Sequence, residues 1–255
     1  MEVNKFDYNF KLCPTRDLLL TLEAIFKDLE YIGINKKSIL NIFDLSDIDF
    51  KSDTYTEILY SKVQDKVLKE SDRINDLCVQ LQQRWEEYKH EYFNIINKVL
   101  GITINKEIVT HTYCYLQLLP INQVDLNDNV IYLDANNDID EIFKQYIILL
   151  TKTMLINRWS YVNDWKFNTK FSPKNKIWIF AEIAVDAIFN SRELSKITKE
   201  PTYKFFYSLS NDGCNMMQNF RKLYAELPLD KFFNEVYFFV YKNYSKFLKF
   251  KQFLY

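Results

Sequence analysis

Two long apolar segments, at Asp138–Trp159 and Lys174–Asn190, constrain the fold more than any other feature of the chain. Each predicts a helix that is apolar nearly all round, and such a helix belongs in the centre of a domain, buried on every side. Asp138 is the predicted N-cap of the first helix, with Glu141 in the reciprocal capping position. Ser172-Pro173 is a typical start for the second.

The region 1–101 is predicted to be helical for most of its length. We expect three short elements first: a strand within residues 1–13, a helix from an N-cap at Thr15 to Gly33, and a helix at Lys37–Phe43. From Thr54 to Leu100 the chain has no Pro or Gly, and apolar residues at 3-4 spacing predict a long amphipathic helix ended by Gly101. Thr54 and Glu57 form a capping-box pattern, and Ser71-Asp72 is expected to break the segment.

The region 102–255 is predicted to add a small sheet. Glu107–Leu119 and Asn129–Asn136 are short, rich in β-branched or aromatic residues and predict strands, whereas the polar residues 121–129 predict a loop between them. Two or three more helices are expected after Pro201. The predicted fold is therefore α+β and mainly helical, with the two regions in one continuous domain.

Composition excludes several classes of protein. Only 3 of 255 residues are glycine and each stands alone, so the chain has no Gly-rich phosphate loop, dinucleotide fingerprint or nucleophile elbow. The 33 basic and 34 acidic residues give a net charge of -1, which disfavours a general nucleic-acid binder. No apolar run approaches the roughly 18 residues that span a bilayer.

These features predict a cytoplasmic protein without a bound cofactor. The N-terminus lacks the apolar core of a signal peptide. The four cysteines lack paired metal-ligand spacing, which favours reduced thiols. Abundant Lys, Asn, Ile and Tyr suggest an AT-rich genome of bacterial, phage or plasmid origin.

The histidines offer little for catalysis. His90 lies in a charged run and is expected on the exposed face of the long helix. His111 lies three residues before Cys114 in a predicted strand, and an odd offset places the two on opposite faces. A shared metal site there is therefore not expected.

The order of elements from Trp85 to Asn190 resembles the zincin-type metallopeptidases of bacteria. RWEEYKHEYFNIINKVLG resembles the helix that precedes the strands of that family, LLTKTMLI lies where its His-Glu-x-x-His helix would be, and WIFAEIAVDAIF lies where a later helix supplies a glutamate ligand. The resemblance implies that Thr151 and Leu155 occupy the histidine positions, Lys152 the catalytic glutamate position and Glu182 the third ligand position. Thr, Leu and Lys cannot bind or activate zinc in those roles, so the resemblance implies an inactive pseudo-peptidase without metal.

Glu182 and Asp186 are candidate cleft carboxylates, since the i and i+4 positions share one helix face. One hypothesis is that the Lys152 ammonium reaches Glu182 and replaces part of the charge of a zinc ion. In a second interpretation both carboxylates face water beside Arg192 or Lys174. A glycosidase-like acid/base pair is disfavoured, because carboxylates one turn apart rarely flank a substrate bond.

The preferred functional prediction is a binding module for a protein or peptide partner. Val130, Ile131, Tyr132 and Leu133 are predicted to form an edge strand to which a peptide can add. The alternatives are a hydrolase of unrecognised mechanism that uses Glu182 and Asp186, and an interaction component of a mobile-element or defence system. The aromatic and basic C-terminal segment, with a stripe at Phe232, Val236, Phe239, Tyr241 and Tyr244, is interpreted first as core packing and second as a surface for anionic membranes or single-stranded nucleic acid.

Overall fold

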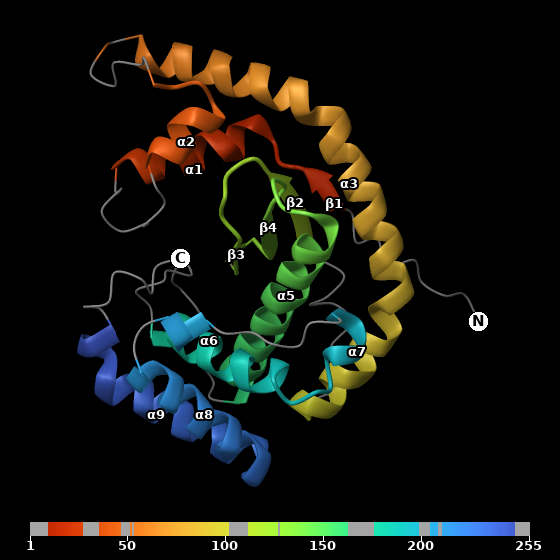
Figure 1. Ribbon diagram of the computed structural model, residues 1–255, viewed down its shortest axis with the longest axis vertical. Coiled ribbons are helices and arrows are strands. Elements are labelled where there is room, and N and C mark those ends of the chain that lie inside the picture. The colour runs from red at the N-terminus through yellow and green to blue at the C-terminus, as the bar shows by residue number, and fades with distance from the viewer. Residues whose placement is uncertain are drawn as a thin grey trace.

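The fold is α+β and mainly helical, as predicted (Figure 1). The computed structural model describes residues 10–27, 36–46, 52, 54–101, 112–126, 128–162, 176–198, 205–208 and 211–247. In chain order the elements are β1 (Phe10–Leu12), α1 (Thr15–Lys27), α2 (Lys36–Ile42), α3 (Tyr55–Leu100), β2 (Tyr113–Gln117), β3 (Gln123–Asp125), β4 (Val130–Asp134), α5 (Ile139–Val162), α6 (Lys176–Phe189), α7 (Ser195–Thr198), the 3-10 turn η2 (Phe205–Ser208), α8 (Asn211–Glu226) and α9 (Leu229–Phe247). Gly33, His111, residues 107–111 and Ser172-Pro173 lie outside the described residues. Within the described part, no helix is long and apolar enough to cross a membrane.

The four strands form one mixed sheet in the order β1-β2-β4-β3. The first three are parallel, and β3 runs antiparallel to β4. Because β1 belongs to the N-terminal region and pairs with β2, the two predicted regions share one sheet. The prediction of a loop at 121–129 is wrong at β3, where buried Val124 pairs with Ile131 between two half-buried polar neighbours. One apolar residue in a polar run is too short an alternation to indicate a strand.

Helix α3 curves along the outside of the molecule without a break (Figure 1). The predicted interruption at Ser71-Asp72 is wrong: the Ser71 hydroxyl donates to the carbonyl of Leu68 (2.8 Å), and the buried stripe continues from Val67 to Ile74. Thr54 precedes the helix but makes no side-chain capping bond, so the capping box does not form. Gly101 ends the helix in the left-handed conformation (φ 61°), as predicted.

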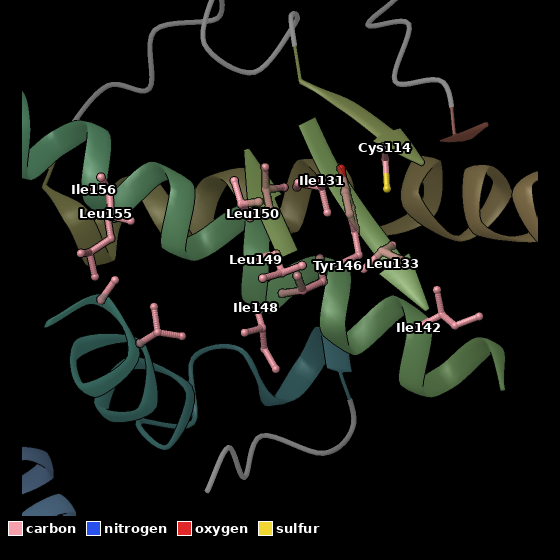
Figure 2. Close-up of a cluster of buried hydrophobic side chains, with 14 of the residues drawn as sticks. Cys114, Ile131, Leu133, Ile142, Tyr146, Ile148, Leu149, Leu150, Leu155 and Ile156 are labelled. Carbon is pink, nitrogen blue, oxygen red and sulfur yellow. The ribbon is translucent and has the colours of Figure 1, made fainter. Parts of the chain in front are cut away.

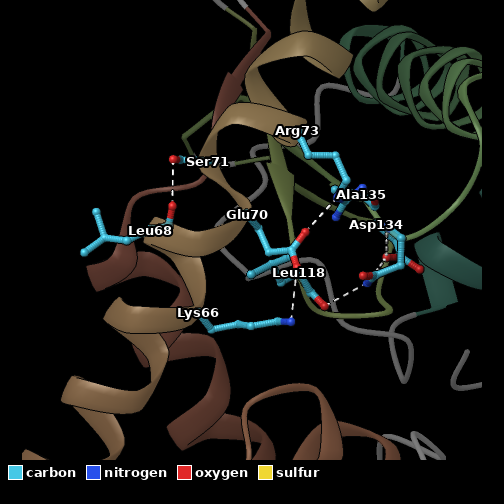
Figure 3. Close-up of polar contacts among 9 residues, drawn as sticks. Lys66, Leu68, Glu70, Ser71, Arg73, Leu118, Asp134 and Ala135 are labelled. Atoms are coloured by element: carbon cyan, nitrogen blue, oxygen red, sulfur yellow. Dashed lines mark hydrogen bonds and ion pairs between the residues drawn. The ribbon is translucent and has the colours of Figure 1, made fainter.

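A polar contact fixes α3 against the loop that follows β4 (Figure 3). Arg73 Nη1 donates to the carbonyl of Ala135 (2.7 Å), and its Nε pairs with Glu70 (2.7 Å), which also accepts from Lys66 (3.1 Å). The carboxylate of Asp134, the last residue of β4, accepts bonds from Asn136 and Asn137 in that loop. These bonds hold α3 against the carboxyl end of β4.

Helices α5 and α6 form the centre of the molecule, as the two apolar segments predicted. Side chains of α5 pack on β4 and β3, and α5 also contacts α3 and α6 (Figure 2). Helix α6 is buried along nearly its whole length beneath α5, α8 and α9. Asp138 caps α5 by accepting from the Glu141 amide (2.9 Å), but the Glu141 carboxylate accepts from Lys144 and Gln145 instead of closing a capping box.

Two further helical predictions have clear outcomes. Helix α1 begins one residue earlier than predicted: Thr15 is its first residue and not its N-cap, because the carbonyl of Pro14 accepts the first helical bonds. After Pro201 the described chain forms η2, α8 and α9, as expected. On α9, Phe232 and Val236 are buried in the core and Phe239 is half-buried against it, whereas Tyr241 is exposed. The core interpretation of the C-terminal stripe therefore holds for its first part.

Candidate functional site

Lys152 and Glu182 meet where α5 crosses α6. The Lys152 Nζ donates to Glu182 Oε1, and the two residues are only 5% and 1% exposed. The ammonium also lies 5.9 Å from the ring centroid of Trp178. The expected contact between this lysine and this glutamate is thus present, and it is a buried ion pair inside the apolar core.

Asp186, one turn further along α6, has a different partner. Its carboxylate is fully buried and accepts from Arg221 of α8 through two bonds, from Nε (3.0 Å) and from Nη2 (3.1 Å). Asn190 Nδ2 donates a third bond (3.2 Å). The interpretation in which Glu182 and Asp186 face water beside Arg192 or Lys174 is therefore wrong, because both carboxylates are buried in ion pairs.

Burial dominates the electrostatics of Asp186. It raises the pKa of this carboxyl from 3.8 to about 6, against the opposing effect of Arg221, and the negative charge of Glu182 raises it further. The Arg221 guanidinium lies 4.9 Å from the ring centroid of Tyr207. The pKa of Tyr207 is raised to about 12 by burial and by the charge of Asp186.

The four residues form a row of charges across three helices: Lys152 on α5, Glu182 and Asp186 on α6, and Arg221 on α8. The row carries two positive and two negative charges, so it has no formal net charge. Arg221 was missed by sequence reasoning. The only signal was its place beside Phe220 on the buried face of an amphipathic helix, which does not identify a partner 35 residues away.

The other positions implied by the zincin resemblance face elsewhere. The Thr151 hydroxyl donates to the Ile147 carbonyl (2.8 Å) and lies 3.1 Å from the hydroxyl of Tyr92 on α3. Leu155 is completely buried in the core cluster (Figure 2). The fold therefore brings Lys152 to Glu182, turns Thr151 toward α3 and packs Leu155 among apolar side chains.

Metal-ligand residues do not gather in the described part of the chain. No group of three or more His, Cys, Asp or Glu side chains is placed there to hold an ion. His90 is exposed on α3, as predicted.

Cys13, Cys78 and Cys114 are buried free thiols, and burial raises the pKa of Cys13 to about 12 and that of Cys78 to about 11. These thiols are poor nucleophiles, because the thiolate is the reactive form.

The predicted peptide edge is in the wrong place. Val130, Ile131, Tyr132 and Leu133 lie in β4, which pairs with β2 on one side and, from Val130 to Tyr132, with β3 on the other, so β4 is not an edge strand of the described sheet. Among the described strands, β3 forms that border of the sheet. Because the pairing of β3 was not predicted, its neighbour was mistaken for the border.

Comparisons with protein-family models, with curated proteins and with solved structures found no match to this chain.

Proposed function

We propose that the chain is a catalytically inactive, zincin-like protein that binds a protein or peptide partner. The observation that carries the proposal is the buried ion pair between Lys152 and Glu182. In the zincin resemblance these are the positions of the catalytic glutamate and the third metal ligand. The order α3, β2, β4, α5 and α6 also follows the succession of elements that the resemblance implies.

The residues at these positions do not fit a zinc ion. Zinc binds imidazole, thiolate or carboxylate ligands, usually in a tetrahedral set. The Thr151 hydroxyl is hydrogen-bonded to the Ile147 carbonyl and the Tyr92 hydroxyl, and the Leu155 side chain has no atom that can bind a metal ion. The Lys152 ammonium is a cation, so it supplies positive charge to Glu182 but cannot hold or activate water as a base does. We therefore derive no hydrolytic step at this site.

The hydrolase alternative with Glu182 and Asp186 is disfavoured by the same geometry. A general acid or base must reach a substrate atom directly or through one water molecule. Both carboxylates are buried, and each is neutralised by its own cation, Lys152 or Arg221. Their arrangement is that of a structural charge row.

Binding is assigned to the border of the sheet at β3. An extended peptide adds to a sheet edge through main-chain hydrogen bonds, and alternate side chains provide specificity. Among the described strands, β3 pairs only with β4. At the opposite border, β1 contacts α3, which covers it. The two borders therefore differ. Helix α3 packs closely along β1, whereas the described helices contact β3 only slightly.

The test is selection of binding peptides from a displayed random library, followed by affinity measurements with two variants, Gln123→Pro and Val124→Pro. Successive residues in a strand direct their N–H groups to opposite sides of the strand. Of the two neighbouring proline variants, one therefore removes an N–H group that points outward to a bound peptide, and the other removes an N–H group that bonds to β4. We expect the outward variant to keep its fold and lose peptide affinity. Selected peptides that bind both folded variants as tightly as the unmodified chain would refute the assignment.

A further inference from the structure

A buried arginine, Arg158 near the end of α5, has donors that the described chain does not use. It is 8% exposed, and its Nη2 pairs with Asp230 Oδ1 (2.6 Å) in the first turn of α9. Its Nε and Nη1 are buried and have no hydrogen-bond partner among the described residues. A guanidinium has five N–H groups in a fixed planar fork, so most of its donor capacity is left over.

This arrangement is unusual on energetic grounds. Buried polar groups are nearly always hydrogen-bonded, because an unmade bond costs the desolvation of the group. Among the described residues, the one charge partner of Arg158 is the Asp230 carboxylate, which is itself 63% exposed, and pairs with an exposed member are weak. Arg221 in the same molecule shows the usual solution, since two of its nitrogens bind a fully buried Asp186. Arg158 is therefore built like a buried ion-pair residue that lacks most of its acceptors.

The surroundings favour a negative ligand. The Arg158 guanidinium lies 5.5 Å from the ring centroid of Phe233, one turn into α9, so it is placed against the start of that helix. The N-terminus of a helix carries a partial positive charge and unpaired amide donors, which attract anions. α9 has 19 residues, which is long enough for this effect, and the exposed Lys231 lies in the same turn.

We propose that Arg158 and the N-terminal turn of α9 form a binding site for a small oxyanion, a phosphate or a carboxylate. Oxygen atoms of the anion accept from Nη2 together with Nε or Nη1 of Arg158, the two edges on which a guanidinium makes a planar two-point contact with such anions. Nη2 carries two hydrogens, so it can donate to Asp230 and to the anion. Asp230 occupies only Nη2 and competes for the remaining donors. The site is separate from the Lys152–Glu182 pair and does not depend on the proposed function.

Thermal unfolding in phosphate, acetate and chloride at matched ionic strength tests the site, because a ligand that binds the folded chain raises Tm saturably. We expect a saturable rise of a few degrees with phosphate or with acetate, and the anion that gives it identifies the ligand. Arg158→Lys keeps the charge but loses the fork, and should lose the rise. Arg16→Lys, at an exposed position on α1, is the matched control and should keep it.

A second variant covers the case in which Arg158→Lys fails to fold. Asp230→Asn removes the competing carboxylate from an exposed position and leaves Arg158 in place. It should bind the effective anion several-fold more tightly in calorimetry. The proposal is wrong if neither anion shifts the Tm of the unmodified chain saturably, if Arg158→Lys responds like Arg16→Lys, or if Asp230→Asn leaves the affinity unchanged.

Discussion

Replacing Lys152 by methionine removes the ammonium while retaining most of the side-chain volume. Glu182 is 1% exposed, so the substitution leaves a buried carboxylate without its cation. Breaking a buried ion pair in this way costs about 3–5 kcal/mol of unfolding free energy. For a chain of this length that is a fall in Tm of roughly 6–20 °C, at about 2–4 °C for each kcal/mol.

The matched control is the double variant Lys152→Met/Glu182→Leu. Replacing both members of a buried pair by apolar residues is often neutral or stabilising by about 1–4 kcal/mol. We therefore expect the double variant to be at least as stable as the unmodified chain in urea unfolding followed by circular dichroism. A cost of less than about 0.5 kcal/mol for Lys152→Met, the typical size of a surface effect, would show that the lysine and the glutamate do not form a buried ion pair. Additive effects of the two substitutions would show the same, because the members of a buried pair are energetically coupled.

Three further changes have defined outcomes. Because the pKa of Asp186 is raised from 3.8 in the unfolded chain to about 6, its contribution to stability is fully present below 3.8 and is lost as pH rises through 6; urea titrations should show a loss of about 3 kcal/mol across that window, and Asp186→Asn should abolish this slope. Thr151→Val deprives the buried Tyr92 hydroxyl of its oxygen partner at 3.1 Å and should cost about 1–3 kcal/mol in the same assay, whereas a change within error would show that the bond is not needed. Gly101→Ala meets no atom within 4 Å but requires a left-handed alanine, so a loss of about 1–2 kcal/mol is expected, and an unchanged Tm would contradict the cap assignment.

Local patterns predicted the parts of the fold that depend on neighbours in the chain. Continuous 3-4 spacing identified α3, and the apolar character of α5 and α6 placed them at the centre. Gly101 ended α3 because a left-handed residue is needed there. Ser71-Asp72 misled because both residues favour caps, yet packing of the buried stripe on either side outweighs that preference.

Features that depend on distant partners were harder to predict. The Lys152–Glu182 contact was one of two interpretations left open by the sequence, and it was suggested because the resemblance set two specific helices against each other. The partner of Asp186 was not predicted, since the packing of α8 on α6 decides which basic residue arrives. The border of the sheet was misplaced for the same reason, because the three residues of β3 acquire their role only by pairing with β4.

The zinc content of the purified chain tests the central claim most directly. The protein is incubated with excess zinc, separated from free metal by gel filtration and analysed by mass spectrometry for metal per chain. Lys152 is paired to Glu182, and neither Thr151 nor Leu155 carries an imidazole, thiolate or carboxylate, so the account predicts no stoichiometric zinc. One zinc ion per chain that is lost in Glu182→Gln would contradict it.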